Sequence, residues 1–303
     1  MGLSKKLRRD FQYALVRFLV GGMKLLSPEA GYSAACFLGG CAYVLIPKAR
    51  EQVIRNLSLA FPEKGRGEVA LLGRASFREL GRNAWDALRM DSAGGSFLKE
   101  NVRFSGLELF DQAMKLNRGV VVVTGHIGCW ELVPAAFASL GYPINVIGRR
   151  AYDDRLNELL VGLRSRHGIN TIDRDTGAKE ALRCLRRGEA LGVLIDQDTR
   201  VKGVFVPFFG QPAYTPTGAV EFALRTGAAL VPMAIHRNGD GKHTIEVLES
   251  FPLLSTGNEE QDLTLHTQRC TEILEGFIRK HPDQWVWMHE RWRTKPNHEN
   301  SHG

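Results

Sequence analysis

The sequence predicts an α/β fold: a mixed, mostly parallel sheet flanked by helices, preceded by a helical region that associates with a membrane. Short apolar runs rich in β-branched residues alternate with helical segments from about residue 115 to the end. The segment before them has a helical pattern throughout. The amino end combines basic residues with apolar stretches, which is typical of membrane-associated helices.

The composition fits a packed globular chain with an anionic partner. Of the 303 residues, 44% are hydrophobic and 24% are charged, which excludes general disorder. The net charge of +7 indicates nucleic acid, an anionic membrane or an acidic substrate as partner. Five cysteines without a C-x-x-C pair argue against a disulfide scaffold or a structural zinc site, and favour a reducing compartment.

The amino end predicts a membrane anchor. Four basic residues lie within the first ten positions: Lys5, Lys6, Arg8 and Arg9. An apolar stretch from 11 to 26 is interrupted by Arg17 and Lys24, and a second one from 30 to 46 carries no charge. Neither reaches the roughly 20 clean apolar residues of a confident spanning helix. We therefore expect an interfacial amphipathic helix or a short span, with the basic residues facing the cytoplasm.

The chain divides in this interpretation into two parts. Residues 1–48 form the anchoring helices, and residues 49–303 form a single α/β domain with a helical lead-in to about residue 115. Within that lead-in, Phe77–Met90 places apolar residues at helical spacing.

The first half of the α/β region starts with the apolar run Gly119-Val-Val-Val-Val-Thr124, which predicts a buried strand. A helix follows and is stopped by Gly141. The remaining elements alternate: strand 143–147, helix 153–166, strand 169–174, helix 179–187 and strand 190–196.

The second half predicts two further strands and two helices. Residues 203–210 form an apolar loop or an edge strand, since Pro207 disfavours a central position. A helix covers 217–225 and a long helix covers 263–280. Strands at 228–237 and 243–250 form an antiparallel pair across the turn Asn238-Gly-Asp-Gly241. Phe205, Pro207, Phe208 and Phe209 line a groove, dip into a bilayer or belong to the core.

A histidine follows the first buried strand, at the edge where functional residues gather in such sheets. Gly125 and Gly128 flank His126, and they let the backbone turn tightly and a substrate approach it closely. Glu131 lies at the start of the next helix. A carboxylate bonded to one imidazole nitrogen leaves the other as a base, able to take a proton from a substrate hydroxyl. The alternative is a core histidine beside an ordinary helix cap.

A second polar strand end carries Asp196 and Asp198. Two carboxylates with few neighbouring histidines are a poor metal site, so we expect them to position the active site. Arg149 follows the strand at 143–147, where a guanidinium suits a phosphate group. A solvated basic strand end is the alternative for Arg149.

Several ordered segments resemble the lipid A late acyltransferases, the lauroyl and myristoyl transferases of the H-x4-D/E acyltransferase superfamily. The similarity covers about residues 50–296. The matching segments are Arg55-Asn-Leu-x-x-x-Phe-Pro62, His126-Ile-Gly-Cys-Trp-Glu131, Asp196-Gln-Asp-Thr-Arg-Val-Lys-Gly-Val-Phe-Val-Pro-Phe-Phe-Gly210 and Trp287-Met-His-Glu-Arg-Trp-Arg-Thr-Lys-Pro296. The H-x4-E motif alone is weak evidence, whereas the ordered set is strong.

The resemblance implies a glycerolipid-acyltransferase-like fold and an enzyme without a resident cofactor or metal. Such enzymes move a fatty acyl chain from acyl-carrier protein to a hydroxyl of a lipid A precursor, at the cytoplasmic face of the inner membrane. Acyl-CoA is the alternative donor. The implied partners are acyl-carrier protein, an anionic lipid acceptor and the membrane surface.

The resemblance also implies roles for individual residues. His126 is the general base and Glu131 is its partner. Arg164 matches an arginine near the acceptor site, and Asp196 and Asp198 match the acidic strand-end pair. We further expect backbone N–H groups near Gly128 to contribute to an oxyanion hole.

Three alternatives remain open at this point. Gly128 and Trp130 within the motif depart from the bulky apolar residues of the lipid A enzymes, so the acceptor is alternatively a lysophospholipid or another glycolipid, such as a mannosylated one. A metal-dependent hydrolase built from His126, Glu131, Asp196 and Asp198 is a second class. A nucleic-acid-binding protein has the least support, because the basic residues are dispersed and no nucleic-acid motif is present.

Overall fold

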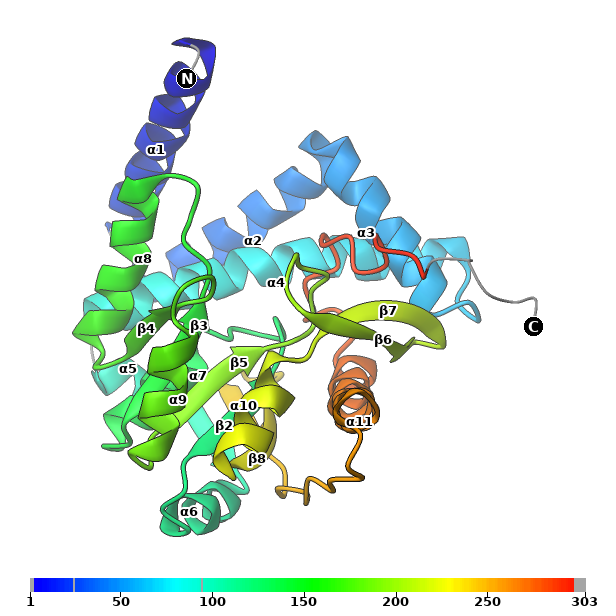
Figure 1. Ribbon diagram of the computed structural model, residues 1–303. Coiled ribbons are helices and arrows are strands. Elements are labelled where there is room, and N and C mark those ends of the chain that lie inside the picture. Colours follow the sequence, from blue (N-terminus) through cyan, green and yellow to red (C-terminus); the bar gives the residue numbers. More distant parts are fainter. Residues whose placement is uncertain (1–2, 24, 94, 297–303) are drawn as a thin grey trace.

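The computed structural model describes residues 3–23, 25–93 and 95–296, and Figure 1 shows the arrangement of the elements. The central sheet has seven strands in the order β1-β9-β8-β2-β5-β3-β4. In chain order these are β1 (Val102–Ser105), β2 (Val120–Thr124), β3 (Ile144–Gly148), β4 (Asn170–Asp173), β5 (Ala190–Leu194), β8 (Ala229–Arg237) and β9 (His243–Val247). A separate hairpin contains β6 (Gly203–Phe208) and β7 (Gln211–Pro216).

The helices before the central strand β2 are α1 (Leu3–Met23), α2 (Pro28–Leu45), α3 (Pro47–Ala60), α4 (Arg66–Ala93), α5 (Gly95–Asn101) and α6 (Leu107–Lys115). Those after it are α7 (Leu132–Ser139), α8 (Asp154–Arg166), α9 (Ala178–Arg186), α10 (Gly218–Thr226) and α11 (Glu259–Lys280).

The sheet is mixed and mostly parallel, as predicted. β2 lies between β5 and β8 and is parallel to both, and β3 joins β5 to β4 in the same direction. β8 and β9 are antiparallel, with Arg237 opposite His243 across the predicted turn. β1 runs parallel to β9 at the edge of the sheet.

The two faces of the sheet are covered by different helices, and β2 shows how the sequence divides between them. Val121 and Val123 contact one core, which includes apolar residues of α3, α9, α10 and α11. Val120 and Val122 contact the other, which is built on α5, α6 and α7. Both faces of β2 are buried, which explains its continuous run of valines.

Close packing joins α2 to α4, and α2 lies just above α4 in Figure 1. A Cβ at Gly39 would lie 2.3 Å from the carbonyl oxygen of Phe77, and a Cβ at Gly81 would lie 2.2 Å from that of Ala35. Glycines at these positions therefore allow the two helix backbones to approach. α1 contacts α8, because Arg155 forms an ion pair with Asp10 at 2.9 Å.

The amino-terminal helices bear on the predicted anchor. Among the described residues, no single helix is long and apolar enough to cross a membrane. α2 and α3 satisfy the length and composition together, but they are bent by 92° at the break between them. Residues 1, 2 and 24 of the predicted anchor lie outside the described part of the chain.

Two strands were not predicted. The segment up to residue 115 was expected to be helical, yet β1 forms there because it pairs with the outer edge of β9. β7 contains Pro212 and Pro216, which disfavour a strand, but it pairs with β6 through a tight turn. Phe209 and Gly210 form that turn with φ values of 51° and 71°, and two positive values are typical of a type I′ hairpin. Phe208 and Phe209 are both buried in the core.

Candidate active site

His126 follows β2, and Asp196 follows the neighbouring parallel strand β5, so both lie at the same edge of the sheet. Asp196 Oδ1 lies 2.8 Å from the imidazole Nδ1 of His126. Its Oδ2 accepts a hydrogen bond of 2.7 Å from the backbone N–H of His126 and another of 2.7 Å from the indole N–H of Trp285. Asp196 therefore fixes the position and the rotation of the imidazole.

The carboxyl group of Asp196 is fully buried and ionised. Burial by itself raises its pKa, but the charge of His126 and the hydrogen bonds from His126 and Trp285 outweigh it and lower the pKa to about 2. A carboxylate only accepts hydrogen bonds, so Nδ1 of His126 carries the proton. The imidazole side chain is 23% exposed and lines a cavity, which leaves Nε2 available as a base.

Glu131 does not occupy the place predicted for it beside the imidazole. It forms a bidentate ion pair with Arg164, with Nη2–Oε1 at 2.6 Å and Nε–Oε2 at 3.0 Å. Glu131 is the residue before α7, and Arg164 reaches it from α8. The predicted pairing is wrong because a neighbouring strand, β5, delivers a carboxylate to Nδ1. Glu131 and Arg164 nonetheless line the same cavity as His126.

Gly128 packs against the protein itself, although the sequence predicted a contact with substrate. Its φ is +54°, and a Cβ would lie 2.3 Å from the carbonyl oxygen of Ile235, so only glycine fits well. Its N–H donates to the carbonyl of Gln284 at 2.8 Å, and its carbonyl accepts from Asn83 Nδ2 at 2.9 Å. The N–H group proposed for an oxyanion hole is therefore already bonded within the protein.

Asp198 anchors the carboxyl-terminal segment at the rim of the cavity. It accepts hydrogen bonds from the backbone N–H and the hydroxyl of Thr294, at 2.7 and 3.0 Å, and from Arg293 at 3.1 Å. The expected role of Asp196 and Asp198 in positioning the site stays a prediction, which is supported by these contacts. They do not support direct substrate contact by Asp196, which is buried beneath His126.

The cavity has a volume of about 960 Å³ and a rim rich in cations. The basic side chains that line it are Arg149, Arg164, Arg174, Arg200, Lys202 and Arg293. Its acidic lining residues are Glu131, Asp198 and Glu221, so cations are in excess. Arg149 is exposed and lines the cavity, and its expected binding of a phosphate stays a prediction. Arg174 was not predicted, although it follows β4 and the same strand-end rule applies to it.

A narrow apolar pocket opens beside the cavity. Aliphatic and aromatic side chains line it, including Val122, Val133, Phe137, Val146 and Met233. The pocket and the cavity share five lining residues, namely Trp130, Glu131, Ile147, Arg164 and Leu194. The Glu131–Arg164 ion pair thus lies where a polar cavity meets an apolar one.

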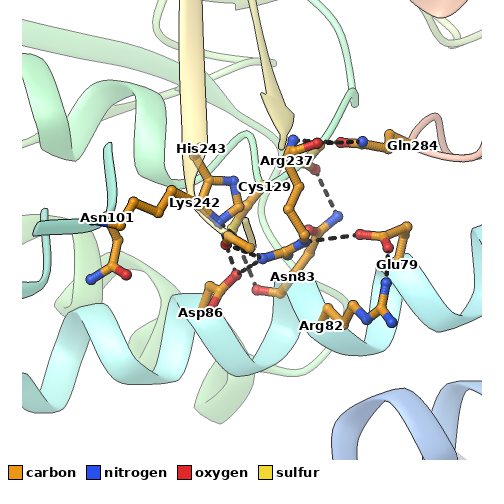
Figure 2. Close-up of polar contacts among 12 residues, drawn as sticks. Glu79, Arg82, Asn83, Asp86, Asn101, Cys129, Arg237, Lys242, His243 and Gln284 are labelled. Carbon is orange, nitrogen blue, oxygen red and sulfur yellow. Dashed lines mark hydrogen bonds and ion pairs between the residues drawn. The ribbon is translucent and has the colours of Figure 1, made fainter. Parts of the chain in front are cut away.

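A buried polar network, shown in Figure 2, contacts the loop that carries His126 and Glu131. Arg237 on β8 forms ion pairs with Glu79 at 3.0 Å and Asp86 at 2.6 Å, both on α4. It also donates to Asn83 at 2.8 Å. Because the Asn83 amide donates to the Gly128 carbonyl, the network holds the backbone between His126 and Glu131. Sequence reasoning missed the network, since its members look like ordinary charges on a helix and a strand.

The four residues of the metal-dependent hydrolase do not converge on one point. Asp196 is bonded to His126, Glu131 to Arg164, and Asp198 to the segment at 293–294. Within the described ranges, no three His, Cys, Asp or Glu side chains are arranged to hold a metal ion.

The segments that carry the family resemblance meet in space. Asn56, from the early Arg-Asn-Leu motif, donates hydrogen bonds to the carbonyls of Trp287 and His289 in the closing motif, at 2.8 and 2.7 Å. Phe61 of the early motif packs against Phe209 and Trp287. The early and closing motifs therefore contact each other, and Phe209 of the segment 196–210 packs against both.

Several known proteins resemble this chain over most of its length. The phosphatidylinositol mannoside acyltransferase of Mycolicibacterium smegmatis is 25% identical over 93% of this chain and 91% of its own length. In Escherichia coli, the lipid A biosynthesis lauroyltransferase is 27% identical over 88% and 86% of the two chains, and the palmitoleoyltransferase is 27% identical over 98% and 97%. The sequence profile described as bacterial lipid A biosynthesis acyltransferase matches residues 3–294. The chain therefore belongs to the bacterial lipid A biosynthesis acyltransferase family and is an acyltransferase.

Proposed function

We propose that the protein transfers a fatty acyl chain from an acyl thioester to a hydroxyl of a lipid A precursor, with His126 as the general base. The observation that carries the proposal is the His126–Asp196 pair, which opens onto a large cavity with a cationic rim. Acyl-carrier protein is the proposed donor, and acyl-CoA offers the same thioester.

The proposed reaction has two proton transfers, both at Nε2 of His126. Nε2 takes the proton of the acceptor hydroxyl while its oxygen attacks the thioester carbonyl. Asp196 stabilises the imidazolium that forms, through the Nδ1–H hydrogen bond. The tetrahedral intermediate then expels the thiolate, which receives the proton back from Nε2. The products are the acyl ester and the free thiol of the carrier.

The Glu131–Arg164 pair has a different proposed role from the one expected at first. It lies at the junction of the cavity and the apolar pocket, where the thioester carbonyl would sit between an anionic acceptor and an apolar chain. Arg164 then supplies positive charge near the developing oxyanion, and Glu131 holds its guanidinium in place. Arg149 at the rim binds a phosphate of the acceptor or the carrier arm.

We further propose that the protein works at the inner membrane with the cavity facing the cytoplasm. Large apolar side chains are exposed in the amino-terminal region: Phe18, Phe37 and Leu45 lie on helices, and Leu25 lies in the turn between α1 and α2. Burial of these side chains in the headgroup region would remove apolar surface from water, which favours membrane binding.

A mannosylated phospholipid is a second candidate acceptor. One of the similar proteins is a phosphatidylinositol mannoside acyltransferase that matches 93% of this chain. A mannosylated phospholipid shares the features that the cavity selects, namely an anionic phosphate and a free sugar hydroxyl. A lysophospholipid is the simplest acceptor with an anionic phosphate and a free hydroxyl, which it carries on glycerol.

The test is an acyl-transfer assay in detergent with a panel of acceptors. Purified protein is incubated with palmitoyl-acyl-carrier protein or palmitoyl-CoA, and products are followed by mass spectrometry. We expect one acceptor to gain one acyl group. His126→Ala should lower the rate by about 10³-fold or more, because the base is removed. Transfer that persists in this variant would exclude His126 as the base.

The matched control is His167→Ala, at the end of α8 and outside both cavities. It should keep the activity of the unmodified protein. Acceptors tested side by side decide between the lipid A precursor, the mannosylated lipid and the lysophospholipid.

A further inference from the structure

A second groove lies between α2 and α4, away from the catalytic cavity. Its volume is about 610 Å³, and it shares no described lining residue with the cavity around His126. One wall is α2, with Phe37, Val44 and Leu45, and the other is α4, with three arginines. The groove thus combines an apolar wall and a cationic wall.

The arginines form a row along one side of α4. Arg74, Arg78 and Arg82 are spaced at i, i+4 and i+8, which places them on the same helix face. Like charges at this spacing destabilise a helix unless an anion neutralises them. A row of this kind therefore needs counter-charge from the protein or from a ligand.

Among the described residues, counter-charge is supplied to only one of the three arginines, Arg82. Arg82 is in contact with Glu79 and lies over the ring of Tyr32. Within the described part of the chain, neither Arg74 nor Arg78 has an ion pair or a hydrogen bond, and no acidic side chain is among the described residues that line the groove. Two uncompensated guanidinium groups therefore face the groove.

The groove has room at the point where Arg78 crosses α2. A Cβ at Gly40 would lie 3.5 Å from Nε of Arg78, so a glycine here keeps the space beside the guanidinium open. The apolar wall of the groove is exposed to solvent: Phe37 is 70% exposed, Val44 is 60% exposed and Leu45 is 76% exposed. Exposed apolar side chains beside unpaired arginines suit a molecule that is both anionic and apolar.

We infer that this groove binds the phosphate headgroup of an anionic membrane phospholipid, with its acyl chains against Phe37, Val44 and Leu45. Arg74 and Arg78 would hold the phosphate by charge-assisted hydrogen bonds. An acidic peptide or a free anion would satisfy the arginines but would leave the apolar wall in water. The inference rests on the proposed membrane association, and it adds a lipid site that is distinct from the acceptor cavity.

The test is vesicle binding by the full chain. Co-sedimentation is measured with vesicles of phosphatidylcholine alone and of phosphatidylcholine mixed with phosphatidylglycerol. For Arg74→Gln/Arg78→Gln we expect affinity for the anionic vesicles to fall by about 25-fold, since each basic side chain at such a surface contributes about fivefold. Arg74→Lys/Arg78→Lys keeps the charges and should retain most of the affinity.

The matched control is Arg118→Gln/Arg186→Gln, which removes the same charge from two exposed arginines next to the amino ends of β2 and β5. Its affinity for anionic vesicles should change by less than about threefold. An equal loss in both double variants would mean general attraction by net charge and would overturn the inference. Unchanged binding in Arg74→Gln/Arg78→Gln would also overturn it.

A second variant keeps the test independent of any folding defect. Gly40→Leu blocks the groove without changing the charge, and should lower the ratio of the two vesicle affinities. An unchanged ratio would contradict a headgroup site. Acyl transfer by the unmodified protein in detergent is measured separately, so failure of the proposed function and failure of this inference can be told apart.

Discussion

Two groups of polar side chains lie around the loop from 126 to 131, one at the cavity and one in the buried network of Arg237. The two groups differ in their access to water. On the cavity side, the His126 side chain is 23% exposed and Arg164 is 13% exposed. On the other side, Arg237 is 4% exposed and its partners Glu79 and Asp86 are each 7% exposed. The first group can meet a substrate and the second cannot.

The difference separates charged residues that stabilise the fold from residues that are available for catalysis. Behind the loop, every charge has a protein partner: Arg237 and Arg82 balance Glu79 and Asp86. Such a closed network costs stability if one member is removed, because its partner stays buried without compensation. On the cavity side, Nε2 of His126 has no protein partner in the described ranges, so removal of a group there should change the rate more than the stability.

The largest expected effect concerns the carboxylate on the cavity side. Asp196→Asn removes the charge that stabilises the imidazolium and allows the imidazole to adopt the wrong tautomer. We expect kcat to fall by about 10⁴-fold, equivalent to about 5 kcal/mol. Since the pKa of Asp196 lies at about 2, the group stays ionised near neutral pH, and substitution is the direct way to remove its charge. The measurement is the acyl-transfer rate in detergent.

The matched control for this prediction is Asp198→Asn. Asp198 lies two residues further on and holds the segment at 293–294, with no contact to the imidazole among the described hydrogen bonds. Its effect on kcat should be smaller by at least about 10²-fold. Equal losses in the two variants would mean that Asp196 acts through the general shape of the cavity, and not through His126.

The second effect concerns stability on the closed side. Arg237→Met removes the arginine that pairs with Asp86 and one of the two arginines that pair with Glu79, and we expect the free energy of unfolding to fall by about 3 to 5 kcal/mol. Arg187→Met is the control, because Arg187 also pairs with two glutamates but is 49% exposed. Its cost should stay within about 1 kcal/mol. Urea denaturation of both variants is the measurement, and similar costs would contradict the comparison.

The sequence predicted the edge of the sheet at which the site lies, but not the pairing within it. The valine run before His126 and the apolar run before Asp196 identified two buried strands that end in polar residues. Which carboxylate reaches the imidazole depends on strand order, since Thr124 of β2 pairs directly with Leu194 of β5. Glu131 was predicted to be the partner because it is close in sequence, and adjacency of strands is not visible in a single sequence.

The buried network around Arg237 could not be predicted from the sequence, for a related reason. Its residues come from α4 and from the adjacent strands β8 and β9, which lie about 150 positions later in the chain. Asp86 and Arg237, for example, are 151 positions apart. Glu79 and Asp86 have the spacing of a solvated helix face, and their burial arises only when α4 lies across the ends of the strands. The alternation of strands and helices, by contrast, is a local pattern, and it was predicted correctly from residue 119 onward apart from β7.

The smallest expected effect joins the two sides through Asn83. Asn83→Ala removes the hydrogen bond to the Gly128 carbonyl and the acceptor of Arg237 Nη2, leaving two buried polar groups without a partner. We expect the free energy of unfolding to fall by about 1 to 3 kcal/mol. Because Gly128 lies between His126 and Glu131, kcat should also fall, by about tenfold, with KM nearly unchanged.

Ser76→Ala separates these two consequences on the same helix. Ser76 is buried on α4 like Asn83, but its hydroxyl donates to the carbonyl of Gly73 within the helix and does not contact the loop. This variant should lose about 1 kcal/mol of stability and keep its kcat. If Asn83→Ala lowered stability and left kcat unchanged as well, the buried network would support the fold without positioning the catalytic loop.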